Sequence, residues 1–388
     1  MQEVNEAGSA LLSPGSESQS GRRVGRQGTG RPSRGPSIAD VARAAGVSSQ
    51  TVSRVSNGLT NVEGNTRRRV LEAMTSLGYR PNRAARALKS GQFKSIGVIM
   101  FTLSTFGNMR TLDAIATAAA QAEYSVTLIP LPDPTTGKVS GAYSRLREQQ
   151  VDGVVIIFEA HLLDHTDIQL PEDLPVVVID SNAASGYSVV DTDQAEGARL
   201  ATRHLLGLGH RQVWHIGGPE NSFSALHRAE SWQATLEEAG ITPPPIRHGD
   251  WSTESGYTIG LELGRNPEVT AVFAANDQMA LGAMRAIHEL GREIPGDVSI
   301  VGFDDLEESH SFWPPLTTIH QDFHAVGRLS IENLLGQIDG TGPRSGITKV
   351  PTQLVVRRST APYSPPLVHE SQQSVTQVQR LHGVARST

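Results

Sequence analysis

Hydrophobic side chains recur at helical spacing in residues 37–58, which read SIADVARAAGVSSQTVSRVSNG. This spacing gives a first short helix one apolar stripe, made of Ile38, Val41, Ala42 and Ala45. Gly46 supplies the left-handed conformation of a sharp turn, and Ser48 is placed to cap the free N–H groups of a second helix. Val52 and Val55 face inward from that second helix. The pattern predicts two short helices that pack across a tight turn.

The outward face of the second helix is polar, with Ser49, Gln50, Ser53 and Arg54. Gln50 and Arg54 stand one turn apart. A glutamine pairs bidentately with adenine and an arginine with guanine, so this surface suits the major groove of DNA. We therefore predict a helix-turn-helix motif. The alternative is an ordinary helical hairpin with a solvated polar face.

A third helix is expected over Thr66–Leu77, and its inward positions are Val70, Ala73, Met74 and Leu77. These side chains would complete a small three-helix core. The run Arg67–Arg69 at the start of this helix is expected to contact phosphates.

The next segment, 81–92, reads PNRAARALKSGQ and predicts a helix of about two turns capped by Asn82. Such a short helix is marginal alone, so it would fold when DNA and a partner chain order it. Leu88 on this basic helix suits an apolar wedge between base pairs of the minor groove. The alternative is that Leu88 packs on the neighbouring domain.

From Ser95 to about Thr360, short β-rich runs alternate with amphipathic helical runs. The predicted strands are Ile96–Met100, Ser125–Ile129, Gly153–Phe158, Val176–Asp180, Gln212–Ile216, Ala271–Ala275 and Ser299–Phe303. The predicted helices between them are Leu112–Ala122, Glu196–Leu208, Ala229–Ala239 and Gln278–Leu290. This alternation predicts parallel sheets covered by helices on both faces, in two lobes, with ligands at the carboxyl ends of the strands.

Polar residues stand where that rule places a ligand. Asp180 ends a strand, while Asn276–Asp277 and Asp304–Asp305 each follow one. Trp251 lies in a polar loop, and Arg228 lies near the start of a helix. Carboxylates, an amide and a guanidinium suit sugar hydroxyls, and a flat aromatic ring suits the apolar face of a sugar. Taken singly, each of these residues is equally explained as a helix cap or a loop turn.

The charge is unevenly distributed, and this changes the picture. The chain of 388 residues has a net charge of −6, yet residues 21–94 hold 15 of its 34 basic residues and 3 of its 40 acidic residues. This local field favours phosphate binding, so nucleic acid is expected at the front end only. The basic stretch 21–35 either adds non-specific attraction to DNA or is a solvated tail.

Composition excludes several other classes. The absence of cysteine excludes disulfides and thiolate metal sites, and the 13 histidines form no HExxH motif. We therefore expect no metal and no cofactor. The first residues lack the features of an export signal, and no stretch approaches the ~20 apolar residues of a membrane span. A cytoplasmic protein without membrane contact is the expectation.

The expected organisation has five parts. These are a disordered extension (1–35), a helix-turn-helix domain (36–80), a hinge helix and linker (81–94), a two-lobed sugar-binding and dimerisation core (95–360), and a tail that is expected to be disordered (361–388). The tail carries a weak heptad pattern of Val368, Val375, Val378 and Leu381. A heptad pattern this weak would not hold a helical bundle alone, so it leaves a tetramer open without supporting one.

The order of DNA reader, hinge and sugar-like cleft resembles the lactose repressor family of bacterial transcriptional regulators. The resemblance runs from Ser37 to about Thr360 and rests on AGVSSQTVSRVSN, LGYRPNRAARAL, GDWSTESGY, AANDQMALGAMRAI, VSIVGFDD and PPLTTIHQDF. The third, fourth and sixth stretches are closest to the lactose-type branch. The resemblance implies a small all-α helix-turn-helix headpiece, an α/β two-lobed core similar to type I periplasmic binding proteins, with parallel sheets, and at least a dimer.

By matching position, the resemblance also implies site residues. The DNA-binding set is Ser37, Ser48, Ser49, Gln50, Thr51, Ser53, Arg54, Asn57, Asn61, Thr66, Asn82, Ala85 and Leu88. The ligand-binding set is Asp180, Arg228, Trp251, Asn276, Asp304 and Gln321. Ser49 stands where the lactose-type branch has a tyrosine. Leu226 and His227 replace the residues that precede the ligand-binding arginine in that branch. Segment 101–110 shares little with its counterpart. The operator sequence and the sugar are therefore open to difference.

The hypothesis is a repressor that binds double-stranded operator DNA and is released by a small sugar inducer, a galactoside such as lactose or allolactose. One rival has the same architecture but takes a different sugar or depends on a corepressor. Another is a sugar-binding protein without a regulatory role, which the DNA-binding front end opposes. An enzyme is the third, but no nucleophile elbow, phosphate loop or metal spacing accompanies the candidate carboxylates.

Overall fold

The computed structural model describes residues 35–80, 91–103, 105–131, 136–157, 174–179 and 186–364. Contacts divide the chain into two compact units, 1–83 and 84–388. The predicted extension, hinge helix and tail lie wholly or almost wholly outside the described residues. No helix in the described part of the chain is both long enough and apolar enough to cross a bilayer.

The first unit is a headpiece of three helices, α1 (Ile38–Ala45), α2 (Ser49–Ser56) and α3 (Gly64–Leu77). Gly46 ends α1 with φ of +65°, the left-handed conformation expected of it. The apolar stripes of the three helices form one core, made of Val41, Ala42, Ala45, Val52, Val55, Val70, Ala73 and Met74. The periodic positions of the sequence thus build this unit.

Leu77 was wrongly assigned to this core. It is the last residue of α3, immediately before the left-handed Gly78, and 39% of it is exposed. Tyr79, beyond the turn, packs partly buried against the core. The helical period therefore stops one turn earlier than the sequence pattern indicates, because the chain reverses at Gly78.

The second unit contains two lobes, each built on a parallel sheet. The sheet of the first lobe has the order β11-β5-β4-β3-β1-β2 and that of the second has the order β7-β6-β8-β9. The strands of the first sheet are β1 (Ser95–Met100), β2 (Ser125–Pro130), β3 (Gly153–Ile157), β4 (Val176–Ile179), β5 (Ser188–Thr192) and β11 (Gly346–Val350). Those of the second are β6 (Trp214–Gly217), β7 (Arg247–His248), β8 (Ala271–Ala274) and β9 (Ser299–Val301).

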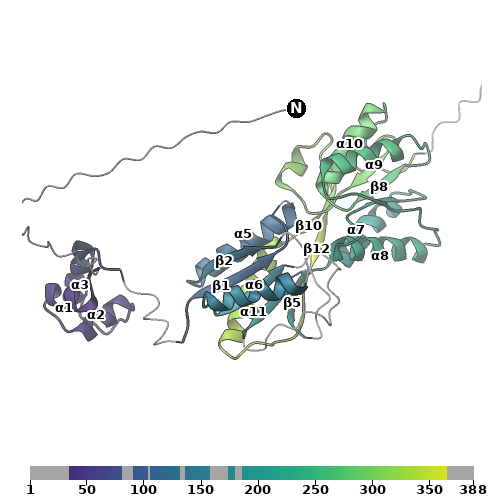
Figure 1. Ribbon diagram of the computed structural model, residues 1–388. Coiled ribbons are helices and arrows are strands. Elements are labelled where there is room, and N and C mark those ends of the chain that lie inside the picture. The colour runs from purple at the N-terminus through teal and green to yellow at the C-terminus, as the bar shows by residue number, and fades with distance from the viewer. Residues whose placement is uncertain are drawn as a thin grey trace, which may run out of the picture. The chain divides into compact units, whose positions relative to one another are not determined.

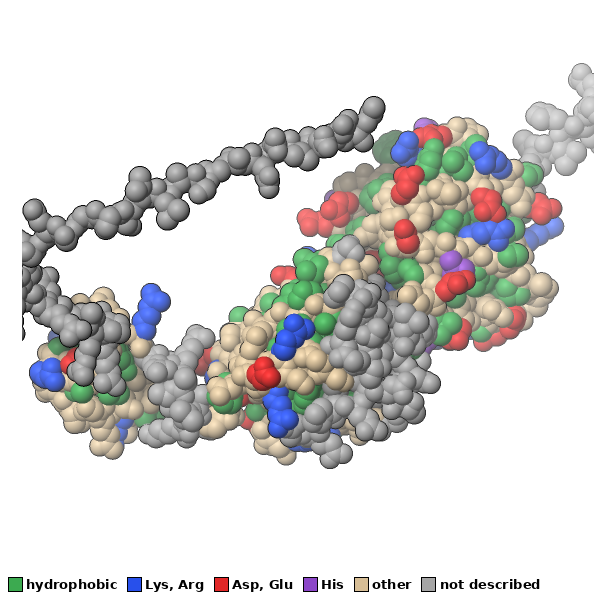
Figure 2. Space-filling view, in the orientation of Figure 1, with side chains coloured by type: hydrophobic (Ala, Val, Ile, Leu, Met, Phe, Trp, Pro, Cys, Tyr) green, Lys and Arg blue, Asp and Glu red, His purple; other side chains and the backbone are tan. Residues whose placement is uncertain are grey.

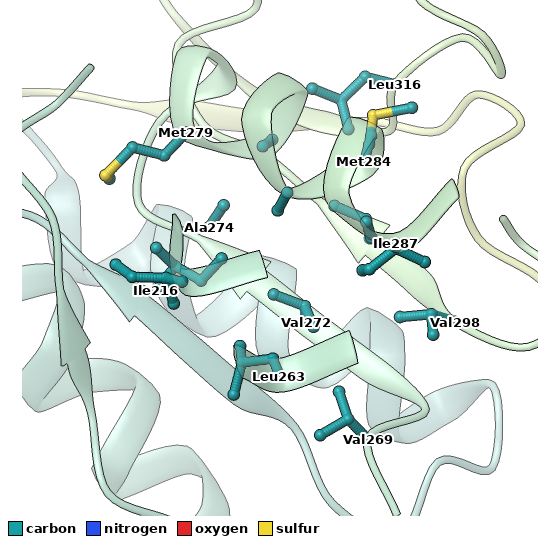
Figure 3. Close-up of a cluster of buried hydrophobic side chains, with 14 of the residues drawn as sticks. Ile216, Leu263, Val269, Val272, Ala274, Met279, Met284, Ile287, Val298 and Leu316 are labelled. Atoms are coloured by element: carbon teal, nitrogen blue, oxygen red, sulfur yellow. The ribbon is translucent and has the colours of Figure 1, made fainter. Parts of the chain in front are cut away.

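Helices cover both faces of each sheet (Figure 1). In the first lobe, α5 (Phe106–Gln121) and α11 (Phe323–Ile338) pack together on one face, and α6 (Thr136–Glu148) lies on the other. In the second lobe, α9 (Thr253–Gly264) and α10 (Asp277–Glu289) cover one face, and α7 (Gln194–Gly207) and α8 (Phe223–Glu238) cover the other. Figure 3 shows α10 placing Met279, Met284 and Ile287 over the β6 and β8 side chains Ile216, Val272 and Ala274.

The chain crosses between the lobes three times, which the sequence did not predict. It leaves β5 for α7 at Asp193, and it leaves β10 (Thr318–Gln321) for α11 at Asp322. It returns from β11 to β12 (Thr352–Val355) at Pro351, and β12 pairs antiparallel with β10. The Asp193 amide donates to the Val350 carbonyl at 2.8 Å, which joins the first crossing to the third.

All seven predicted strands occur, and the structure adds β5, β7, β10, β11 and β12. The antiparallel β10–β12 pair departs from the expected purely parallel pattern. It is formed from segments about thirty residues apart with α11 and β11 of the other lobe between them, so no local pattern marks their pairing.

Two glycines allow α9 and α10 to pack closely. A Cβ at Gly256 would overlap the Met279 backbone, and one at Gly282 would overlap the Thr253 carbonyl oxygen. Neither neighbour can move without shifting a helix. We expect Gly282→Ala to lower the free energy of unfolding by about 1–3 kcal/mol, measured by urea denaturation.

Gly141 in α6 provides the matched control, because a Cβ there meets nothing within 4 Å. Gly141→Ala should stabilise the protein by about 0.5–1 kcal/mol through helix propensity alone. Equal effects of the two substitutions would contradict the close packing of α9 against α10.

Candidate functional site

The structure places the predicted DNA-reading residues of α2 on the surface of the headpiece. The Ser48 hydroxyl accepts a hydrogen bond from the Thr51 amide at 3.1 Å and so caps α2 as predicted. Ser49, Gln50 and Arg54 are exposed, while Val52 and Val55 are buried beneath them. The helix therefore presents one polar side to solvent and anchors the other. Figure 2 shows Lys and Arg side chains on the visible face of the headpiece.

The other predicted DNA contacts are spread along the same unit. Ser37 caps α1 in a capping box with Asp40, and exposed Asn57 ends α2. Asn61 is exposed between α2 and α3, and Thr66 lies half-buried in the first turn of α3. Three further predicted contacts lie outside the described residues: Asn82, Ala85 and Leu88.

The arginine run of α3 makes contacts within the headpiece that the sequence did not predict. The Arg69 guanidinium donates to the carbonyls of Ala45 and Gly46 at the end of α1, and Arg67 donates to the Leu59 carbonyl. A cation at the last carbonyls of a helix satisfies acceptors that have no partner within the helix. Arg67 and Arg69 therefore link α3 to the other two helices, and phosphate contact by this run stays a prediction.

A cavity of about 400 Å³ lies between the two lobes of the second unit. The second-lobe side contributes most of the predicted ligand residues, and the crossing strand β10 contributes one. Five of the six predicted residues line this cavity: Arg228, Trp251, Asn276, Asp304 and Gln321. The sixth, Asp180, lies outside the described residues.

Arg228, Gln194, Gln321 and Asp304 form a closed ring of polar contacts. Arg228 Nε donates to Gln194 Oε1 at 2.8 Å, and Arg228 Nη2 lies 3.8 Å from Asp304 Oδ1. Gln194 Nε2 donates to Gln321 Oε1 at 3.3 Å, and Gln321 Nε2 donates to Asp304 Oδ1 at 2.6 Å. The guanidinium also donates to the Ala275 carbonyl. The ring joins α8, β10 and the end of β9 to the first crossing between the lobes.

Aromatic rings enclose this guanidinium. Its carbon lies 3.8 Å from the centroid of Phe303 and 5.5 Å from that of Trp251. Arg228 is 4% exposed, so the two aromatic side chains and the polar contacts replace water around its charge.

Asp304 is held in an unusual state. Burial raises the pKa of Asp304 to about 6, and the Arg228 charge and the Gln321 hydrogen bond oppose that rise. Its backbone has φ of +111°, a conformation that costs a non-glycine residue free energy. Strain and a perturbed carboxyl in one cavity are typical of a functional site.

Asn276 and Trp251 are linked through the backbone. Asn276 caps α10 by accepting from the Met279 amide at 2.8 Å, and its Nδ2 donates to the Trp251 carbonyl at 3.0 Å. The Trp251 ring lies against Gly218, where a Cβ would overlap it. The cap explanation of Asn276 is therefore correct, and the same residue also lines the cavity.

Two neighbouring carboxylates have structural roles instead. Asp277 accepts from the Leu306 amide and from the Ser309 and Thr318 hydroxyls. Asp305 pairs with Arg357 at 2.6 Å and with His320 at 3.0 Å. Neither is among the residues that line the cavity.

Sequence reasoning missed several cavity residues. Gln194 gave no signal, because its role depends on partners far along the chain. Thr105 and Asn108 lie at the start of α5, and Asp191 lies near the end of a strand that was not predicted. Among the described residues, no three His, Asp or Glu side chains gather as a metal site.

Comparison with known proteins agrees with this architecture. Residues 37–82 match the family described as bacterial regulatory proteins, lacI family, and residues 202–360 match a periplasmic binding protein-like domain. The chain is 37% identical over 326 residues to the lactose operon repressor of Escherichia coli (strain K12), covering 83% of this chain and 89% of that protein. It is 35% identical over 331 residues to the HTH-type transcriptional repressor PurR of Haemophilus influenzae (strain PittEE), covering 83% and 98%.

A solved structure of the Lac repressor dimer bound to operator and the anti-inducer ONPF superposes with a TM-score of 0.76 at 36% identity, covering 84% of this chain and 100% of that chain. The predicted fold class, a helix-turn-helix headpiece and a two-lobed type I periplasmic-binding-like core with parallel sheets, is thereby confirmed. The prediction that the protein is not an enzyme is also confirmed, since its relatives are transcriptional repressors. The chain belongs to the lacI family of bacterial regulatory proteins.

Proposed function

We propose that this lacI-family repressor binds operator DNA as a homodimer and leaves it when a small sugar occupies the cavity between its lobes. The observation that carries the proposal is the pairing, in one chain, of an exposed polar α2 face with a cavity lined by Arg228, Asp304 and Trp251. A galactoside is the first candidate sugar, because the chain is similar over most of its length to the lactose operon repressor. A regulator of transcription acts beside the chromosome, so we place the protein in the cytoplasm.

In this proposal α2 enters the major groove. Gln50 and Arg54 read base edges, while Ser37, Ser48, Asn57 and similar short polar side chains position the headpiece on phosphates. Two headpieces would read two half-sites of a near-palindromic operator. Asn82, Ala85 and Leu88 would contact DNA from the hinge, with Leu88 in the minor groove.

Support for a homodimer comes from the relatives, since the Lac repressor structure that this chain resembles is a dimer bound to operator. A tetramer is the alternative assembly, and sedimentation measures the number of subunits in the complex.

Arg228, Asn276, Asp304, Gln321 and Trp251 would hold the sugar, with Asp180 beside them. Hydroxyl groups would bond to the carboxylate and the amides, and the Trp251 ring would lie against the apolar face of the sugar. The sugar releases DNA only if it binds one arrangement of the lobes better than the other, by typically ~1–3 kcal/mol per site. The polar ring of Arg228, Gln194, Gln321 and Asp304 beside the crossings between the lobes is the element on which such a preference would act.

The second candidate function is a corepressor-dependent regulator, in which the ligand strengthens DNA binding. The similarity to a PurR repressor favours it. The polar lining favours a sugar, but the lining does not determine the sign of the response. Titration of protein and operator with a panel of sugars and nucleobases distinguishes the two.

Gln50→Ala and Arg54→Ala should each weaken binding to operator DNA from upstream of the gene by about 1–3 kcal/mol. Each should also relax the preference at a base pair of its half-site, because a bidentate contact is lost. Fluorescence anisotropy at fixed salt measures both effects. Arg43→Ala is the matched control on α1, where Arg43 pairs with Asp40, and it should leave base preference unchanged. Unaltered base preference in both α2 variants would refute α2 as the reader.

Asp304→Asn should reduce the response of the DNA complex to sugar at least about tenfold, since a charged hydrogen bond is worth about 1.5–3 kcal/mol. Binding to operator without sugar should persist. Lactose, allolactose and galactose are titrated into the complex and anisotropy is recorded. Asp339→Asn changes an exposed carboxyl at the end of α11 and should respond like the parent protein. Release by a sugar other than a galactoside would retain the DNA reader and replace the proposed ligand.

A further inference from the structure

The first-lobe wall of the cavity is polar, and of the proposed sugar contacts only Asp180 belongs to that lobe. The described wall presents Thr105, Asn108 and Thr111 from the start of α5, and Asp191 and Thr192 from the end of β5. The other proposed contacts come from the second lobe and from the crossing strand β10. A ligand that fills the cavity must therefore satisfy a second set of polar groups.

Asp191 is the most demanding of these groups. It is 7% exposed, and burial raises its pKa to about 7, with Lys349 as the main opposing charge. In the described part of the chain no side chain donates a hydrogen bond to it. The Lys349 ammonium bonds to Asp193 instead, at 3.2 Å. The Thr192 backbone bonds to this carboxylate. A carboxylate can accept several hydrogen bonds, so one that is buried at a cavity without a described side-chain donor has room for a group that arrives from outside.

Two further polar atoms of the cavity are buried without a hydrogen-bond partner among the described residues, Thr105 Oγ1 and Gln278 Oε1. The nearby Arg228 and Gln321 nitrogens are directed to Gln194, Ala275 and Asp304. A ligand group that meets Gln278 Oε1 must donate, because an amide oxygen only accepts, whereas the Thr105 hydroxyl can donate or accept. A ligand hydroxyl satisfies both.

The charged residues that line the cavity also limit which ligands can bind. Three described lining residues are carboxylates, Asp191, Asp250 and Asp304, and Arg228 is the one basic residue among the described lining residues. The Ser252 hydroxyl holds the pKa of Asp250 below its usual value, so that group is ionised at neutral pH. This balance repels a phosphate or carboxylate on the ligand.

We propose that Asp191 determines effector specificity by accepting a hydrogen bond from a hydroxyl at the first-lobe end of the ligand. The effector is then an uncharged glycoside with hydroxyl groups at both ends. Sugar phosphates and sugar acids are rejected. This assignment rests on the proposed sugar-binding function and adds the residue that selects among sugars.

The test is isothermal titration of the full-length protein with lactose, galactose and galactose 6-phosphate. Asp191→Asn removes the charge and keeps the shape. It should weaken lactose binding about tenfold and narrow the preference for galactose over galactose 6-phosphate. Asp339→Asn is the matched control and should bind as the parent protein does.

The pH profile separates this role from a structural one. A hydroxyl donates best to the ionised carboxylate, whose fraction rises with pH through about 7, so lactose binding should tighten about threefold to fivefold from pH 6.5 to 8. The charged groups that act on Asp191 are Lys349, Arg228 and Asp193. In Asp191→Asn this tightening should disappear.

Folding of the variant is checked by thermal unfolding. Because the pKa of Asp191 is raised in the folded state, the folded protein keeps a proton that the unfolded chain loses, and stability falls as pH rises from about 4 to 7. Asp191→Asn should therefore melt no lower than the parent at pH 8. Unchanged lactose affinity and an unchanged pH profile in a folded variant would overturn the role of Asp191 alone. Failure of the parent protein to bind any of these sugars would overturn the sugar effector and this assignment together.

Discussion

The buried charge of Arg228 is the constraint around which the second unit is organised. A guanidinium removed from water needs hydrogen-bond acceptors and a counter-charge in fixed positions, or its burial costs several kcal/mol. Here the requirement is met by Gln194, Ala275 and Asp304, with Gln321 closing the ring. Gln194 and Gln321 adjoin two of the places where the chain passes between the lobes. The charge balance of the cavity and the connection of the lobes are therefore one arrangement.

That arrangement bears on the proposed switch. A ligand that competed for Asp304 or Gln321 would alter the surroundings of Arg228, and the change would reach the crossings through Gln194. Packed cores resist continuous deformation, so such a change would favour one of a few discrete lobe arrangements. The close glycine-mediated packing of α9 on α10 would keep the second lobe rigid. In the proposed function, ligand binding would therefore move one lobe against the other rather than loosen either lobe.

The sequence predicted what depends on local periodicity. The apolar stripes of the headpiece and the seven strands could be predicted, because the pattern of each lies within a short stretch of the sequence. The pairing of β5 with β11 joins segments more than 150 residues apart, and no local pattern encodes it. Gln194 is likewise unremarkable until Arg228 and Gln321 are placed around it. Leu77 shows the converse error. It fits the helical period of α3, but it is the last residue before the turn at Gly78 and its side chain is exposed.

The cavity was predicted unevenly for the same reason. Residues such as Asn276 and Asp304 follow strands that have a clear pattern, so the rule for parallel sheets found them. The opposite wall comes from the end of the unpredicted strand β5 and from the start of α5. That wall holds Asp191, to which no described side chain donates, and Thr105, whose Oγ1 is buried without a partner among the described residues. A fold that serves many ligands changes specificity through the side chains that line its cavity, so these polar groups limit what the ligand must bring.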